Sequence, residues 1–196
     1  MTTAVVTMEC QRGVIGDLAT FPALATAVAE SGLVAALERL VAAARAHGIV
    51  VAHAMFEFSR DPSLHPTNAP LLRYAGQIPG QLCEGTDAVA LIPELRPEPT
   101  DLISRRRHGV SPFIGTDLDR ELRGAGVDTI VACGASLNVG VLGLCIEAVN
   151  LGYEVVMPLD ATVAVPPSFG TELVVNTYRQ LVTLTTVDEL IAEWAR

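Results

Sequence analysis

Short apolar runs alternate with helical segments along the chain, and this alternation limits the possible folds more than any other feature. The apolar runs predict six strands, at residues 4–8, 49–54, 101–104, 129–133, 153–157 and 182–185. Helical spacing predicts helices at 31–48, with Ser31 as its cap, at 116–123, 138–151 and 170–180, and at the end of the chain around Leu190, Ile191 and Trp194. We therefore expect an α/β fold over residues 1–196: a single-domain, Rossmann-like three-layer sandwich, with a mainly parallel six-stranded sheet and helices on both faces.

The composition narrows the function as well as the fold. The chain has 196 residues, half of them hydrophobic, which suffices for one domain with a full core. Its formal charge is −9, so we expect a small-molecule partner and no nucleic acid. The sequence contains no lysine, which excludes a Schiff base and a P-loop. Because the apolar runs are short and the four cysteines lack CxxC spacing, we expect no membrane partner and a cytoplasmic location.

Ligands of parallel sheets collect beyond the carboxyl ends of the strands, so we expect the site there. The segments that follow the predicted strands are Glu9, residues 53–56, 105–111 and 134–140, and Asp160. Residues 58–99 are rich in proline and glycine and lack periodicity, yet they carry Leu71, Leu72, Tyr74 and Ile78, which are costly to leave in water. This segment is expected to be either a lid over a crevice or an arm that contacts a neighbouring subunit.

Several segments, in a fixed order along the chain, carry a family resemblance. Glu9-Cys10-Gln11 resembles an Asp-x-Gln motif, and residues 111–118 resemble Ser-Ala-Phe-x-x-Thr-x-Leu. With the strand-loop-helix segment 131–141, and with Gly152-Tyr153 and Asp160-Ala161 further on, the chain resembles the isochorismatase-like (cysteine hydrolase) superfamily over nearly its whole length. The resemblance implies a hydrolase of small molecules and a homo-oligomer, either a dimer or a tetramer.

The same resemblance indicates a divergent member that lacks the nucleophilic cysteine. Amidohydrolases of this family use an aspartate, a lysine and a cysteine, and the matching positions here hold Glu9, Arg107 and Gly140. Glycine at the last position resembles the isochorismatase branch, which hydrolyses a vinyl ether with water. That branch keeps the aspartate and the lysine, however, and has a glutamine where this chain has Met55.

The three altered positions are the candidate catalytic residues. Glu9 is the candidate general acid or base, although a carboxylate at a strand end is more often a solvated or capping group. Arg107 cannot shuttle protons but can clamp a carboxylate through two hydrogen bonds. Gly140 weakens a helix, so either close packing or room for substrate or water must explain it.

Alternation along the third strand separates the three consecutive arginines. Arg105 and Arg107 should share one face, and Arg106 should lie on the other. Surface ion pairing is the plain alternative for any of them. We assign Arg107 to the site and Arg106 to the opposite face, and an anionic ligand follows from that assignment.

The other site candidates surround these three. The turn at residues 134–137 presents backbone N–H groups at a helix N-terminus, a candidate oxyanion or carboxylate site. The resemblance also implies a non-proline cis peptide between Ala135 and Ser136. The candidate substrate-binding residues are Gln11, Met55, His108, Ser111, Phe113, Ala135 and Ser136.

Neither thiols nor histidines offer a clear substitute for the missing nucleophile. Cys10 and Cys133 lie in or beside buried strands, where packing is the ordinary role of cysteine, and Cys145 lies on another face of its helix from Gly140. The resemblance brings a metal into question, because the nicotinamidase branch of the superfamily holds one with Asp-x-His spacing. His53 and His65 lack that spacing, so we expect no metal and no cofactor.

Two classes of function remain open. The first is an isochorismatase-type hydrolase of a small anionic metabolite, with water as the nucleophile. The second is a catalytically degenerate protein on the same fold, which binds a small molecule or serves in an assembly, because three catalytic positions have changed together. A thiol amidase is the least favoured alternative.

Overall fold

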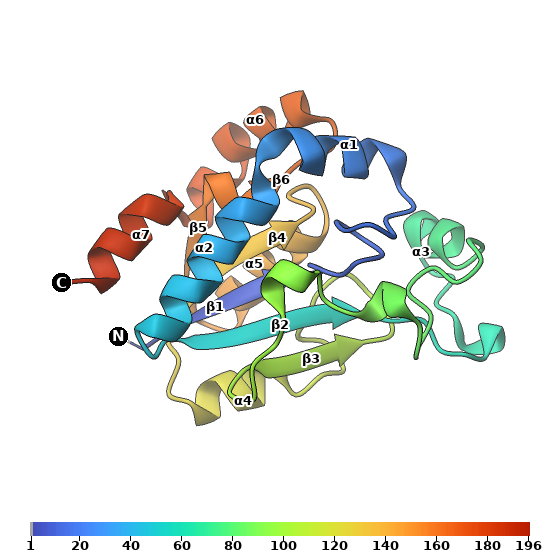
Figure 1. Ribbon diagram of the computed structural model, residues 1–196, viewed down its shortest axis with the longest axis horizontal. Helices are drawn as coiled ribbons and strands as arrows, with labels where there is room; N and C mark the ends of the chain where they lie inside the picture. The colour runs from blue at the N-terminus through green and yellow to red at the C-terminus, as the bar shows by residue number, and fades with distance from the viewer. Residues whose placement is uncertain (1) are drawn as a thin grey trace.

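The computed structural model describes residues 2–196 and is built around one sheet whose named strands all pair in parallel (Figure 1). The strand order is β3-β2-β1-β4-β5-β7, with β6 beside the end of β4. The strands are β1 (Thr3–Met8), β2 (Val50–Phe56), β3 (Leu102–Arg106), β4 (Thr129–Ala135), β5 (Glu154–Pro158), β6 (Thr162–Val163) and β7 (Thr183–Thr185). The predicted α/β class is confirmed, and the two-residue β6 adds a seventh strand to the six predicted.

Helices cover both faces of this sheet. They are α1 (Pro22–Ser31), α2 (Leu33–Ala46), α3 (Pro70–Ala75), α4 (Leu118–Gly124), α5 (Gly140–Asn150), α6 (Pro167–Asn176) and α7 (Val187–Trp194). Within residues 2–196, none of the helices has the length and apolar character that crossing a membrane requires.

Helix α1 lies between the first predicted strand and the first predicted helix, in a segment for which the sequence predicts no helix. Pro22 occupies its first turn, and Gly32, with a φ of 71°, ends it and stands at the start of α2. Ser31 is therefore the last residue of α1 and not the cap of α2. The left-handed conformation of Gly32 makes the turn between the two helices, which a serine would adopt only at a cost.

Two apolar layers hold the sandwich together. Helices α1, α2 and α7 pack on one face of the sheet, and α4, α5 and α6 pack on the other (Figure 1). Alternation within β1 supplies both layers, because Val5 belongs to the first cluster while Ala4 and Val6 belong to the second. The predicted three-layer arrangement is therefore present.

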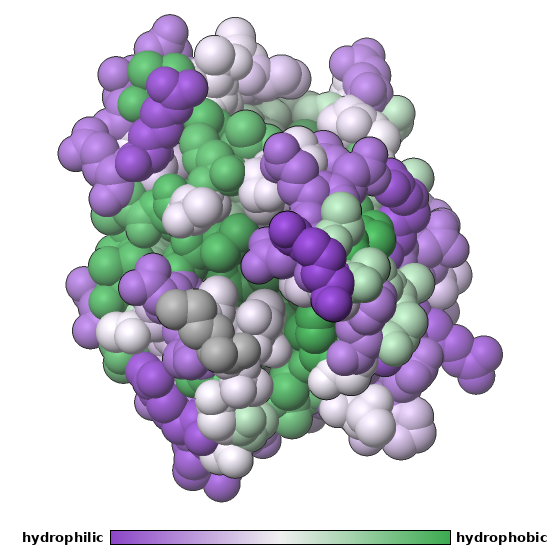
Figure 2. Space-filling view, turned by 90° about the vertical axis from the view of Figure 1, so that its left-hand side faces the viewer, coloured by the Kyte–Doolittle hydropathy of each residue, from purple (hydrophilic) through white to green (hydrophobic). Residues whose placement is uncertain are grey.

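Residues 58–99 are here called the cover segment. Its first part, with α3, lies beyond the carboxyl ends of the central strands (Figure 1), and its last part returns along the sheet to α2, where the Arg96 carbonyl accepts from Arg45 (3.0 Å). Gln11 fixes this segment to the sheet. Its buried side chain donates to the carbonyls of Phe56 (2.8 Å) and Val89 (3.0 Å) and accepts from the Phe56 amide (2.9 Å). On the opposite end of the molecule, Figure 2 shows hydrophobic residues gathered in a connected area that hydrophilic residues border.

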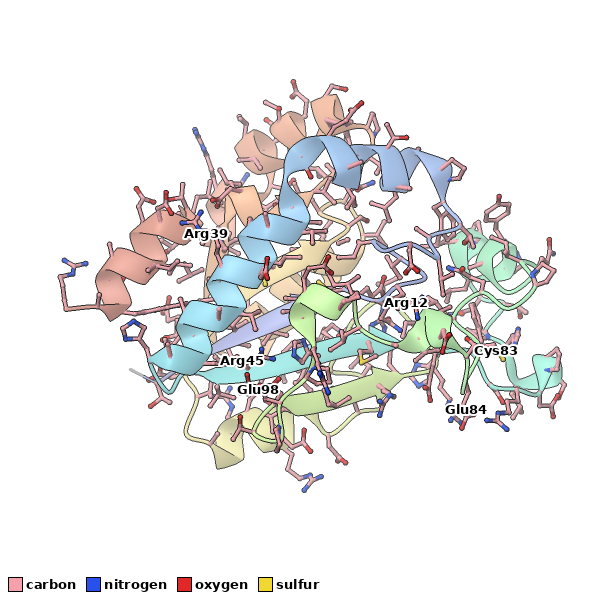
Figure 3. All side chains as sticks on the ribbon, viewed as in Figure 1. Arg12, Arg39, Arg45, Cys83, Glu84 and Glu98 are labelled. Atoms are coloured by element: carbon pink, nitrogen blue, oxygen red, sulfur yellow. The ribbon has the colours of Figure 1, made fainter. Side chains whose placement is uncertain are left out.

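A buried polar cluster joins α2 to the first three strands. The His53 ring bonds Thr7 Oγ1 through Nδ1 (2.7 Å) and Asp101 Oδ2 through Nε2 (3.3 Å). Arg45 donates to the same Asp101 oxygen (2.5 Å) and also lies 3.6 Å from Glu98 (Figure 3). Burial lowers the pKa of His53, and attraction to Asp101 only partly offsets this effect. The histidine is therefore held neutral.

We predict that this neutral histidine makes the fold sensitive to acid. The unfolded chain binds the proton first as the pH falls, so the free energy of unfolding should decrease below about pH 6.5, by up to about 1.4 kcal/mol per pH unit. Urea unfolding between about pH 7 and pH 5 measures how the free energy of unfolding changes with pH. His53→Asn removes the titrating ring and should make this dependence on pH weaker. His47→Asn, at an exposed histidine after α2, should retain it. Equal slopes for the wild type and His53→Asn would contradict the account.

Candidate active site

A cavity of about 290 Å³ opens at the carboxyl ends of the central strands, the region where the sequence predicts the site. The ends of β1 to β4 supply Glu9, Phe56, Arg106 and Ser136 to its lining. The start of α1 and the cover segment close the cavity with mainly apolar side chains, among them Phe21, Leu24, Phe58, Leu71, Leu72 and Leu82. The predicted lid role of the cover segment agrees with this position.

Glu9 is turned into the cavity by its backbone. It follows β1 with a φ of 51°, and its amide donates to the carbonyl of Ala54 (2.8 Å). Strand alternation alone would send Glu9 to the face of Thr7, but the left-handed residue breaks the alternation, and the carboxylate pairs with Arg106 instead. A non-glycine residue in this conformation is uncommon and is often found at functional sites.

Arg106 is the arginine that faces the cavity. It pairs in register with Phe56, which also lines the cavity, and its guanidinium carbon lies 5.3 Å from the centre of that ring. Only 3% of its side chain is exposed. One terminal nitrogen, Nη2, bonds Glu9, and Nε donates to the carbonyl of Gly109 (3.4 Å). The other, Nη1, is buried and has no hydrogen-bond partner among residues 2–196.

Arg107, which the sequence analysis assigns to the site, lies outside the cavity. Its side chain is half exposed and pairs with Glu57 (3.1 Å) and with Glu84 of the cover segment (2.9 Å; Glu84 is labelled in Figure 3). Arg105 also lies beside Glu57, at 3.8 Å. The predicted alternation is therefore correct, but the assignment of faces is wrong: Arg106 points inward while Arg105 and Arg107 point outward.

Gly140, the first residue of α5, is explained by close packing. A Cβ atom at this position would lie 2.8 Å from the carbonyl oxygen of Ala135 and 3.2 Å from Cγ of Met8. The first contact is with backbone, which cannot turn aside as a flexible side chain can. Of the two explanations that the sequence left open, the packing explanation is the one that this geometry favours. A cysteine would fit here only if the backbone moved.

The turn before α5 offers fewer free amides than expected. The cis peptide implied between Ala135 and Ser136 is present, and Ser136 lines the cavity. The Leu137 amide, however, donates to the carbonyl of Val163 (2.7 Å), and the Val139 amide donates to that of Ser136 (3.1 Å). These two N–H groups are already engaged, whereas the amides of Ser136, Asn138 and Gly140, which line the cavity, have no hydrogen-bond partner among residues 2–196. The turn therefore keeps some of the donors predicted for an anion, beside the guanidinium of Arg106.

The remaining predicted substrate contacts lie elsewhere. Gln11 ties the cover segment to the sheet, and Met55 lines a separate groove on the other side of β2. His108 is exposed, and the Ser111 hydroxyl accepts the Phe113 amide (3.3 Å) in the turn after β3. The Phe113 ring packs in the core against Tyr153, with 6.1 Å between their centroids. These motif residues therefore shape the fold around the site and do not line the cavity.

Sequence reasoning anticipated the cover segment as a possible lid but did not name Phe21, Phe58 or Asn138 as part of the cavity wall. Phe21 and Phe58 stand in regions without periodicity, and Asn138 lines the cavity from the turn before α5. The apolar residues of the cover segment were the available signal, because Leu71 and Leu72 both line the cavity. Tyr74 is 57% exposed, with its ring 5.7 Å from that of Phe21.

The buried cysteines are poor nucleophiles. Burial raises the pKa of Cys10 to about 12, and burial alone does the same for Cys145. Burial also raises the pKa of Cys133 well above its ordinary value. None of the three is part of the cavity lining, so their surroundings suit the packing role predicted for them.

Comparison with known proteins places these features in a family. The family model of the isochorismatase domain matches residues 3–189, and the chain therefore belongs to the isochorismatase family of hydrolases. The chain is 31% identical to the isochorismatase family protein YwoC of Bacillus subtilis over 163 residues, which cover 81% of this chain and 76% of YwoC. It is 32% identical to the ureidoacrylate amidohydrolase RutB of Rhizobium rhizogenes over 184 residues, which cover 85% of this chain and 72% of RutB.

Solved structures agree on the fold. The crystal structure of an isochorismatase family protein from Desulfovibrio vulgaris superimposes with a TM-score of 0.83 at 24% identity, and the match covers 100% of this chain and 99% of that one. At this level of identity the likeness concerns the fold alone.

We predict that the contacts of Gly140 reverse the usual effect of replacing a helical glycine. Alanine normally stabilises a helix relative to glycine by about 0.5–1 kcal/mol. At position 140 the added Cβ meets backbone, so Gly140→Ala should lower the free energy of unfolding by about 1–3 kcal/mol. Gly124→Ala is the matched control, because a Cβ there would meet no atom within 4 Å. Urea unfolding measures the free energy of unfolding of both variants. A Gly140→Ala protein as stable as the Gly124→Ala control would contradict the account.

Proposed function

We propose that this protein is an isochorismatase-type hydrolase of a small anionic metabolite and that it uses water as the nucleophile. The observation that carries the proposal is the Glu9–Arg106 pair in the cavity, in which Arg106 Nη1 is buried and has no hydrogen-bond partner in the part of the chain that the structure describes. A buried donor that lacks a partner costs free energy, and an oxygen of an anionic ligand would remove that cost.

Arg106 is the anion-binding group in this proposal, in place of Arg107. Its guanidinium stays protonated, and two of its nitrogens already have partners in Glu9 and in the carbonyl of Gly109. The remaining nitrogen can hold one oxygen of a carboxylate in a cavity with mostly apolar walls, where a charge-assisted hydrogen bond is strong. The RutB relatives are named for ureidoacrylate, itself a carboxylate, which supports an anionic substrate.

Glu9 is the proposed general acid or base. One of its oxygens bonds Arg106, which leaves the other available to exchange a proton with water or with the leaving group. As a base it takes a proton from water, the hydroxide attacks the substrate, and the proton returns to the leaving group. Water is the nucleophile in this scheme because Gly140 supplies no thiol and the buried cysteines lie outside the cavity.

The second candidate function, binding without turnover, rests on the same ion pair. Glu9 is already paired with Arg106, and a carboxylate that remained in this pair would be a weaker base. The arginine would then hold a ligand anion without any hydrolysis. Binding and turnover must therefore be measured separately.

We predict that replacing Arg106 weakens the binding of carboxylates and that replacing its neighbour Arg107 does not. Arg106→Gln should weaken the binding of small carboxylates by about 1.5–3 kcal/mol in calorimetry, because a buried, charge-assisted contact is lost. Arg107→Gln should change binding little, because that side chain is half exposed and lies outside the cavity. Arg106→Lys keeps a charge beside Glu9 and should retain part of the affinity, which guards against a loss caused only by misfolding.

A turnover screen on the same proteins separates the two functions. Small carboxylates that carry amide, ester or vinyl ether bonds serve as substrates, and Glu9→Gln should reduce any hydrolysis by about 100-fold or more. Stabilisation by carboxylates without turnover would favour the binding protein. Equal losses of binding in Arg106→Gln and Arg107→Gln, or no loss in either, would overturn the anion site itself.

A further inference from the structure

The cavity is polar at one place and apolar elsewhere. Glu9 and Arg106 supply the charge, whereas Phe21, Phe56 and Phe58 belong to walls that are otherwise mostly aliphatic. The rings of Phe56 and Phe58 meet edge to face, with their centroids 4.8 Å apart. An occupant of this cavity must therefore cover apolar surface with every part that lies away from the ion pair.

Besides Ser136, which lies at the end of β4 beside the charged pair, the lining contains two uncharged polar side chains, and both are engaged with protein groups. Gln81 Oε1 accepts the hydroxyl of Thr20 (2.7 Å), and its Nε2 donates to the carbonyl of Gly13 (3.2 Å). Asn138 donates to the carbonyl of Val165 (3.1 Å) and accepts the amide of the same residue (3.3 Å). These amide groups hold neighbouring segments of the chain together, so their orientation is fixed by protein contacts and each has one donor and one acceptor site already occupied.

We propose that the substrate is a carboxylate whose remaining part is an aromatic or branched aliphatic group. The carboxylate lies at Arg106 Nη1, and the apolar group lies among Phe21, Phe58 and Leu71, under the cover segment. This inference rests on the proposed function for the carboxylate end and goes beyond it for the apolar end.

The apolar wall also discriminates against polar substrates. A ureido or amide group placed there would lose its hydrogen bonds to water and find few partners on the wall. An apolar group of the same size instead gains from the burial of its surface and of the wall. The cavity volume of about 290 Å³ is sufficient for an aryl or branched-chain acid.

The experiment compares three carboxylates by calorimetry on the intact protein: phenylpropionate, isocaproate and ureidopropionate. The two apolar acids should bind at least tenfold more tightly than the ureido acid, the factor expected from burying about two additional methylene groups. Leu71→Asn should lower the affinity for phenylpropionate at least fivefold and leave that for ureidopropionate unchanged or higher. Leu64→Asn is the matched control, since Leu64 is also an exposed leucine of the cover segment and does not line the cavity.

The outcomes separate this inference from the proposed function. If ureidopropionate binds as tightly as the apolar acids, and Arg106→Gln weakens all three, the anion site stands and the apolar substrate class is wrong. If none of the three binds, the anion site itself fails. If Leu71→Asn and Leu64→Asn have equal effects on phenylpropionate, the cavity wall does not select the substrate and the inference is overturned.

Discussion

The ion pair between Glu9 and Arg106 is the interaction on which the account of the site depends. Removing two charges from water is costly, and such a pair is maintained only where further hydrogen bonds satisfy its remaining donors and acceptors. The Gly109 carbonyl accepts from one nitrogen of the arginine and the ring of Phe56 lies against the guanidinium, yet Nη1 has no hydrogen-bond partner within residues 2–196. The hydrogen bonding of this arginine is thus incomplete among the described residues, and the proposed anion site is built on that observation.

The fold could be predicted because periodicity reports burial. Strands buried on both faces are continuous apolar runs, and the helices between them show one apolar stripe, so the order of elements follows directly. Helix α1 was not predicted because its mostly small residues give no clear apolar face. In addition, Gly32 alone joins it to α2, so no loop separates the two helices. The two-residue β6 is formed by the ladder to the end of β4, a tertiary contact that has no local signal.

The candidate site could be predicted only in part, and the arginines show why. The alternation of side chains along a strand predicts that Arg106 and Arg107 lie on opposite faces of the sheet. It does not predict which of the two faces the site. The register between β2 and β3 decides this, because it places Arg106 beside Phe56, and register is a property of the assembled sheet. Gly140 is similar: its helical position is visible in the sequence, whereas the carbonyl of Ala135 that crowds it is visible only in the structure.

A crystal structure of the protein with bound phenylpropionate tests the central claim most directly. The account predicts one carboxylate oxygen within hydrogen-bonding distance of Arg106 Nη1, with Glu9 still beside the same guanidinium and Arg107 still paired with Glu57 and Glu84. A carboxylate bound at Arg107, or an Arg106 Nη1 that bonds only to protein groups while the ligand lies elsewhere, would contradict it.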